Sequence, residues 1–232
     1  MNTAVLATTQ ELSLPTLPLW LEVLVMSLNC MFGAALARGR SVPVFGTVLA
    51  GVIVGLGGGM LRDMLLGVEP VAIAEWPFLP FGIALAVVGG FGFGVMGRHG
   101  TFFLALNGLV LGTLVTIGAQ RALSFEVPWI SAIFLGVITA SFGGLLADNM
   151  AGQRATIAKQ AHWVGSALVV GSITFVLVSQ VVAFGISVAL AVAVAASLRF
   201  FSQFLDWPSP SWPGERNETA TDTDASHGKD GS

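Results

Sequence analysis

Long apolar segments alternate with short polar ones along most of the chain. The first begins at Leu19–Trp20 and ends near Arg38–Arg40, and the others cover Val44–Leu66, Phe78–Gly97, Phe102–Leu123, Trp129–Met150, Trp163–Ala183 and Phe184–Phe204. About 20 apolar residues are enough for a helix to cross the hydrocarbon core of a bilayer. We therefore expect an all-α integral membrane protein with seven transmembrane helices, the last two joined by a tight turn near Phe184–Gly185.

Composition supports the membrane class. Of the 232 residues, 54% are hydrophobic and only 10% are charged, against roughly 25% charged in ordinary soluble domains. The formal net charge of −3 comes mainly from residues 206–232, whose Pro, Ser, Thr, Asp and Gly content predicts a disordered tail. We find no basic patch for nucleic acid. The single Cys30 excludes an internal disulfide and a cysteine-based metal site.

The basic residues predict the orientation. They concentrate in the predicted loops one, three and five, whereas the opposite loops carry acidic residues: Arg38, Arg40, Arg98, Arg154 and Lys159 against Glu69, Glu75 and Glu126. The positive-inside rule then places the N-terminus outside and the C-terminus in the cytoplasm of a plasma (inner) membrane. Residues 1–18 contain no Lys or Arg, so they lack the positive region of a cleaved signal peptide. We expect them to form an extracytoplasmic segment.

An internal repeat spans most of the apolar part of the chain. One constant shift without gaps, which we call the repeat shift, superposes Gly51-Val52-Ile53 on Gly136-Val137-Ile138 and Gly58-Gly59 on Gly143-Gly144. The same shift places Asp63 on Asp148. Because each unit would contain three helices, an odd number, the second unit is expected upside down relative to the first. The predicted organisation is a first repeat at 19–100, a second at 101–183 and a seventh helix at 184–205.

The glycine triplet Gly57-Gly58-Gly59 is the main candidate for function. Each glycine costs a helix interior on the order of 1 kcal/mol relative to alanine. One interpretation is a broken helix that lines a pathway, because inverted repeats with matching breaks indicate a midplane site. The other is a close approach by a neighbouring helix, with Arg62 and Asp63 in structural pairs. The repeat favours the first interpretation, with Phe142, Gly143 and Gly144 as the matching break in the fifth helix.

Polar residues at membrane depth add a charged network or gate to this hypothesis. The broken ends would direct helix carbonyls, each end carrying about half a negative charge, toward a cation. Arg62 and Asp63 are adjacent and are not expected to face each other on a helix, so repeat symmetry makes Asp148 a candidate partner for Arg62. For Asn29 we expect an interhelical hydrogen bond. Glu22 either lines an outer vestibule or ends a helix.

The segment from Gly57 to Pro70, GGGMLRDMLLGVEP, resembles the signature of the prokaryotic trimeric intracellular cation (TRIC) channels, which the bacterial glycine transporter domain shares. The fourth helix, from Asn107-Gly108-Leu109 to Arg121-Ala122-Leu123, is similar to a second family pattern. The resemblance covers about residues 20–204. It implies two inverted three-helix repeats plus one helix, a homotrimer with a pore in each protomer, and permeant potassium with some sodium.

The chain departs from the family pattern at several positions. Asn107 replaces the usual aspartate, and Arg121 replaces a lysine; Phe142 and Ala147 replace a glycine and an arginine of the second signature. Phe142 and Asn107 are therefore added to the expected ion pathway. Arg121 is a candidate gate or voltage sensor, because one charge crossing 100 mV is worth about 2.3 kcal/mol. Snorkelling of Arg121 to the headgroups is the alternative.

No cluster of Ser, His and Asp residues falls at a shared depth, so we expect no enzyme, and no cofactor beyond the permeant ions. The hypothesis is a trimeric monovalent-cation channel in contact with membrane lipids, with its pore lined by broken second and fifth helices. The alternative is a secondary transporter of a small neutral amino acid such as glycine, which the same repeat would serve.

Overall fold

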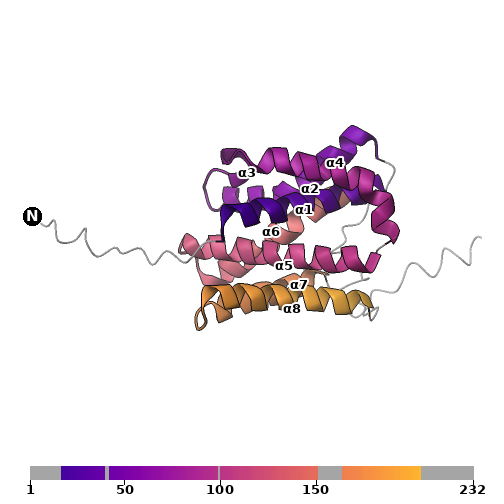
Figure 1. Ribbon diagram of the computed structural model, residues 1–232. Helices are drawn as coiled ribbons and strands as arrows, with labels where there is room; N and C mark the ends of the chain where they lie inside the picture. The colour runs from indigo at the N-terminus through magenta and orange to yellow at the C-terminus, as the bar shows by residue number, and fades with distance from the viewer. Residues whose placement is uncertain (1–16, 40–41, 99, 151–163, 205–232) are drawn as a thin grey trace, which may run out of the picture.

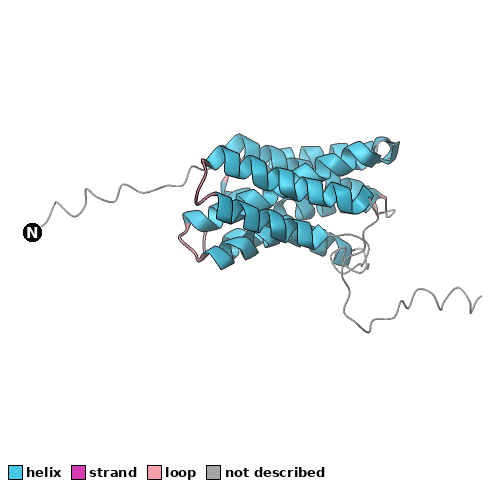
Figure 2. Ribbon diagram, turned by 90° about the horizontal axis from the view of Figure 1, so that it is seen from below, coloured by secondary structure: helices cyan, strands magenta, loops and turns pink. Residues whose placement is uncertain are grey.

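The computed structural model describes residues 17–39, 42–98, 100–150 and 164–204, and the regular structure in these ranges is all helical. The helices are α1 (Leu19–Arg38), α2 (Val44–Leu65), α3 (Val71–Ala74), α4 (Phe78–Arg98), α5 (Gly100–Ser124), α6 (Trp129–Met150), α7 (Val164–Val178) and α8 (Phe184–Phe204). The long helices lie side by side in one bundle (Figures 1 and 2). The predicted C-terminal tail and all but the end of the predicted N-terminal segment lie outside the described residues.

The bundle has two groups of helices. In Figure 1, α1, α2 and α4 form the upper group, and α5, α7 and α8 form the lower group. Within each group the helices pack against one another, and α6 joins them because it contacts both α2 and α5. The α1 helix also contacts α5. The four helices α1, α2, α5 and α6 therefore form the centre of the molecule.

The helices have the apolar character of membrane spans. Within the described residues, α1, α2, α5, α6 and α8 are long and apolar enough to cross a bilayer, whereas the apolar parts of α4 and α7 are shorter. The protein is thus an all-helical, multi-pass membrane protein. The seven apolar segments of the sequence coincide with these helices within a few residues. The turn expected near Phe184–Gly185 lies a few residues earlier, because α7 ends at Val178 and Phe184 already begins α8. The short α3 was not predicted.

The predicted breaks in the second and fifth long helices are wrong. The α2 helix continues through Gly57–Gly59 to Leu65, and α6 continues through Gly143 and Gly144 to Met150. In lipid, giving up backbone hydrogen bonds costs several kcal/mol per group. That exceeds the roughly 1 kcal/mol by which a glycine weakens a helix, so the helical form is retained.

The continuous helices use their glycines for contact instead. A Cβ atom added to Gly58 would overlap the carbonyl oxygen of Thr139, and one added to Gly143 would overlap the carbonyl oxygen of Val54. Gly58 and Gly143 therefore let the α2 and α6 backbones touch. Because residue 54 meets 143 and residue 58 meets 139, the two helices cross in opposite directions. The second interpretation of the triplet, close approach by a neighbouring helix, therefore describes Gly58, and the same contact recurs at Gly143 in α6.

Contacts elsewhere recur at positions that the repeat shift relates. Gly51 lies against the carbonyl oxygen of Cys30 and the Cβ of Ala34, and the corresponding contact recurs in the second half of the chain, where Gly136 lies against the carbonyl oxygen of Val115 and the Cβ of Ala119. A further pair of contacts joins Gly33 to Val54 and Gly118 to Thr139. The two halves thus pack their helices in the same way while running in opposite directions at their crossing.

Candidate functional site

Arg62 and Asp63, in the last turn of α2, form the centre of a buried polar network. Their side chains are 0% and 1% exposed. The Nε of Arg62 donates to Oδ1 of Asp63 at 2.8 Å, and Nη2 of Arg62 lies 2.8 Å from the same oxygen. The expectation that these neighbours do not face each other is wrong, because the long arginine side chain folds back over the short aspartate.

The expected pairing of Arg62 with Asp148 is also wrong. Because α2 and α6 cross in opposite directions, Asp148 lies beside the first half of α2, whereas Arg62 lies in its last turn. At 1.5 Å per residue this separates the two positions by roughly 20 Å along the bundle. The side chain of Asp148 is not among the side chains that the structure describes.

The loop after α2 supplies a further contact to Asp63. The backbone N–H of Val71, the first residue of α3, donates to Oδ2 of Asp63 at 2.9 Å. The chain reverses through Gly67, which has a φ of 73°, a conformation that favours glycine. The Gly67 turn therefore returns Val71 to the carboxylate, and both oxygens of Asp63 are used.

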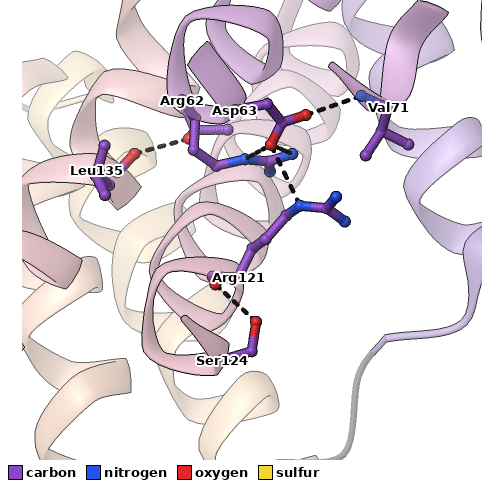
Figure 3. Close-up of polar contacts among 7 residues, drawn as sticks. Arg62, Asp63, Val71, Arg121, Ser124 and Leu135 are labelled. Atoms are coloured by element: carbon purple, nitrogen blue, oxygen red, sulfur yellow. Dashed lines mark hydrogen bonds and ion pairs between the residues drawn. The ribbon is translucent and has the colours of Figure 1, made fainter. Parts of the chain in front are cut away.

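Arg121 reaches the same carboxylate from the end of α5. Its Nε lies 3.2 Å from Oδ1 of Asp63, and its side chain is 29% exposed. In Figure 3, the guanidinium groups of Arg62 and Arg121 both approach Asp63, while Val71 approaches from the other side. The structure thus brings together Arg62, Asp63 and Arg121, with Arg121 as the longer and more exposed contact.

Glu22, near the start of α1, is the fourth charged member of this site. It is 7% exposed and interacts electrostatically with Arg62, Arg121 and Asp63. Its Oε2 is buried and accepts no hydrogen bond within the structure described here. The four residues, which we call the Glu22 cluster, comprise two arginines and two acidic side chains. Sequence reasoning treated Glu22 separately, because it lies on a different helix from Arg62 and far from it along the chain.

Asn107 lies at the opposite end of the bundle, in the first half of α5. Its Oδ1 accepts a hydrogen bond of 2.8 Å from Nη2 of Arg199 in α8. The repeat shift makes Asn107 the mate of Glu22. Sequence reasoning did not connect Arg199 with Asn107, so it missed this contact.

The remaining candidate positions lie around the crossing of α2 and α6. Gly58 and Gly143 are in backbone contact, as described above, whereas an added Cβ at Gly57 would lie 3.6 Å from Cδ1 of Leu146. Gly144 has no atom within 4 Å of an added Cβ. Gly59 faces Cε of Met26, and Phe142 is half-buried in α6. The crossing is thus sealed at Gly58 and Gly143 and looser at Gly57 and Gly144.

A buried amide joins α1 to the same crossing. Nδ2 of Asn29 donates to the carbonyl oxygen of Val54 at 3.1 Å, which confirms the expected interhelical hydrogen bond. No group of three or more His, Cys, Asp or Glu residues able to hold a metal ion is present in the described ranges.

The fold is that of solved TRIC channels. One similar structure comes from a study of conductance through TRIC cation channels. The superposition covers 87% of this chain and 100% of the TRIC chain, with a TM-score of 0.77 and 20% sequence identity. The TRIC channel orthologue from Rhodobacter sphaeroides covers 80% of this chain and 96% of its own, with a TM-score of 0.73 and 27% identity. A prokaryotic TRIC channel in 0.5 M KCl has a TM-score of 0.72 at 19% identity and covers 81% of this chain and 96% of its own.

Sequence relatives are bacterial membrane proteins. The UPF0126 inner membrane protein YadS of Escherichia coli K12 is 29% identical over 137 residues, which are 57% of this chain and 65% of YadS. A UPF0126 membrane protein of Deinococcus radiodurans is 24% identical over 135 residues, 58% of this chain and 63% of its own. The chain thus spans slightly less than two thirds of the curated relatives it matches.

The profile of the glycine transporter family matches residues 19–97 and 104–180. The repeat shift that relates the contacts of the two halves also carries the start of the first matched segment onto the start of the second. Together the segments cover more than half of the chain. The protein therefore belongs to the glycine transporter family and has the fold of the TRIC cation channels.

Proposed function

We propose that the protein is a channel for monovalent cations, potassium with some sodium, with a pathway inside each protomer. The observation that carries the proposal is the Glu22 cluster, in which two arginines and two carboxylates gather at one end of a TRIC-like bundle. Ionisable groups at membrane depth are costly and by default mark a functional site. The 27% identity to the R. sphaeroides channel supports the same assignment.

Arg121 is the moving part of the proposed gate. Arg62 is fully buried and makes two contacts of 2.8 Å to Asp63, whereas Arg121 makes one of 3.2 Å and is 29% exposed. When Arg121 withdraws, the cluster keeps two carboxylates and one guanidinium, so its net charge becomes negative. A cation entering from that end is then attracted by the carboxylates that Arg121 had neutralised. In the proposed closed state, Arg121 occupies the place of the ion.

The proposed pathway passes from the Glu22 cluster along the looser face of the α2–α6 crossing, past Gly57 and Gly144. The continuous helices replace the expected broken ones, so backbone carbonyls at the glycine triplet are not available as ion ligands. Phe142, half-buried on the same turns of α6, is a candidate lining residue. Asn107, at the opposite end of the bundle from the Glu22 cluster, is the proposed lining residue at the other end of the pathway.

The wider architecture of the proposal follows the family. It comprises seven spanning helices, as two inverted three-helix repeats plus α8, and a homotrimer like the trimeric channel of R. sphaeroides. We propose that the protein lies in an inner membrane, because its relative YadS is an inner membrane protein. The concentration of basic residues in the predicted cytoplasmic loops then puts the N-terminus outside. Lipids contact the apolar helices, and no cofactor is required.

Transport of a small neutral amino acid is the second candidate. The family name supports it, and so does the juxtaposition of carboxylates with arginines in the Glu22 cluster, because a zwitterion needs an acid for its ammonium and a base for its carboxylate. In this alternative the unpartnered Oε2 of Glu22 would accept from the ammonium group.

Purified protein in liposomes distinguishes the two functions. For a channel we expect potassium flux that increases with voltage and does not saturate at low millimolar concentration, together with unitary currents in planar bilayers. Saturable uptake of labelled glycine without unitary currents would favour the transporter and overturn the channel.

A further inference from the structure

Arg199 carries a positive charge that no carboxylate contacts within the described ranges. Its Nη2 donates to the neutral amide oxygen of Asn107, and its Nε and Nη1 are buried without hydrogen bonds. The ion pairs of the described residues involve Arg62 and Arg121 at the other end of the bundle. Among the described side chains, the charge of Arg199 is therefore balanced by an amide dipole alone.

Close packing holds this guanidinium in place. An added Cβ at Gly108 of α5 would lie 3.6 Å from Cα of Ala196 and 3.7 Å from Cδ of Arg199, and one at Gly112 would lie 3.1 Å from the carbonyl oxygen of Val192. The small residues of α5 let α8 approach closely. Arg199 consequently lies along the α5–α8 contact, where its side chain is held at the level of Asn107.

The repeat relates this contact to the Glu22 cluster. Asn107 is the mate of Glu22, but the mates of Arg62 and Arg121 are Ala147 and Leu36, which carry no charge. The positions around Asn107 that correspond to the two arginines near Glu22 are therefore uncharged. Arg199 comes from α8, outside the repeats, and brings a guanidinium to the Asn107 end. Within the described part of the chain, the Glu22 cluster has balanced charges, whereas the Arg199–Asn107 contact has an uncompensated positive one.

We propose that Arg199, held by Asn107, is a specificity-determining residue that makes cation conduction depend on direction. The inference rests on the proposed channel function. A fixed positive charge in a partly desolvated mouth lowers the local cation concentration. Cations entering at the Asn107 end meet this charge first, while those entering at the Glu22 end meet a negative cluster once Arg121 has withdrawn. The unitary current is therefore smaller for entry at the Asn107 end.

The test measures unitary currents of the full-length protein in symmetrical potassium chloride at equal positive and negative voltages. Unitary amplitude is used because it is independent of gating by Arg121. We expect unequal amplitudes for the wild type. Asn107→Asp places a carboxylate against Arg199, and Arg199→Gln removes the charge; each is expected to increase the smaller amplitude about twofold and bring the ratio close to one.

Two further variants separate charge from packing. Arg199→Lys keeps the charge and should keep the wild-type ratio. Arg38→Gln removes an exposed arginine from the same end of the bundle, at the end of α1, and should also leave the ratio unchanged. Thermal unfolding of the purified protein shows which variants fold, and Asn107→Asp tests the inference even if Arg199→Gln does not fold.

The inference is overturned if the wild type conducts but Asn107→Asp leaves the ratio unchanged, or if Arg199→Lys alters it as much as Arg199→Gln. A wild-type protein without any cation current would instead overturn the proposed function, and the inference with it.

Discussion

Two arginines contact one carboxylate in this protein, and they are held very differently. Arg62 is 0% exposed and bonded to Asp63 within its own helix, while Arg121 approaches from α5 with 29% of its side chain exposed. A buried charge that loses its partner costs far more than a partly exposed one. Arg62 is therefore primarily structural, and Arg121 is the residue whose contact can be exchanged at low cost.

Removal of the central carboxylate tests the structural role of Arg62. Asp63→Asn leaves the buried guanidinium without its counter-ion, so we expect the free energy of unfolding to fall by about 3–5 kcal/mol. The measurement is thermal or denaturant unfolding of the detergent-solubilised protein. Glu69→Gln changes an exposed acid in the loop after α2 and should be close to neutral. Equal stability of the two variants would contradict the network.

Neutralisation of Arg121 tests the gate. Arg121→Gln is expected to reduce the voltage dependence of opening by up to about 2.3 kcal/mol per 100 mV, the value of one full gating charge. Its contact is partly exposed, so the unfolding free energy should change by less than about 1 kcal/mol. Bilayer recordings and unfolding measurements check the two expectations, with Arg121→Lys as the charge-retaining control. A variant with wild-type voltage dependence would remove Arg121 from gating.

At the scale of helices, the glycines of α2 and α6 act through packing. The sequence made them candidates for a helix break because glycine weakens helices in isolation. Propensity could not show that Gly58 would meet the carbonyl oxygen of Thr139, nor that Gly143 would meet that of Val54. The location of the candidate site in α2 was predictable, whereas the role of each glycine depended on which helix lies beside it.

Alanine substitutions of neighbouring glycines test this distinction. Gly58→Ala places a methyl group against the α6 backbone and should destabilise the fold by about 1–3 kcal/mol. Gly57→Ala has room, at 3.6 Å from the nearest atom, and should be neutral or stabilising by up to about 1 kcal/mol, because alanine favours helix. Gly143→Ala and Gly144→Ala form the matching pair on α6. The measurement is the midpoint of thermal unfolding, and equal shifts within each pair would refute the contact.

At the scale of the whole molecule, the two ends of the bundle carry different charges. The Glu22 cluster combines α1, α2 and α5 at one end, and Arg199 with Asn107 combines α5 and α8 at the other. The basic residues predict which end faces the cytoplasm. This assignment also sets the direction in which voltage would move Arg121, so it links the architecture to gating.

Labelling from the two sides of the membrane tests the orientation. We expect Glu69→Cys, in the loop after α2, to react with a membrane-impermeant maleimide on intact cells, and Arg38→Cys, at the end of α1, to react only after lysis. Both positions are exposed, and the native Cys30 is buried, so unmodified protein is the background control. The reverse pattern would invert the proposed topology.

The membrane class, the helical segments and the internal repeat could all be predicted from the residues alone, because they depend on hydrophobicity and on periodicity among neighbouring residues. The sequence also singled out Arg62, Asp63 and Arg121. Three features required the folded arrangement of the helices: the continuity of α2 and α6, the pairing of Arg62 with Asp63 rather than with Asp148, and the places of Glu22 and Arg199 at the two polar ends. Most of these contacts join residues distant in sequence, and the cost of giving up backbone hydrogen bonds in lipid outweighs the local preferences of glycine.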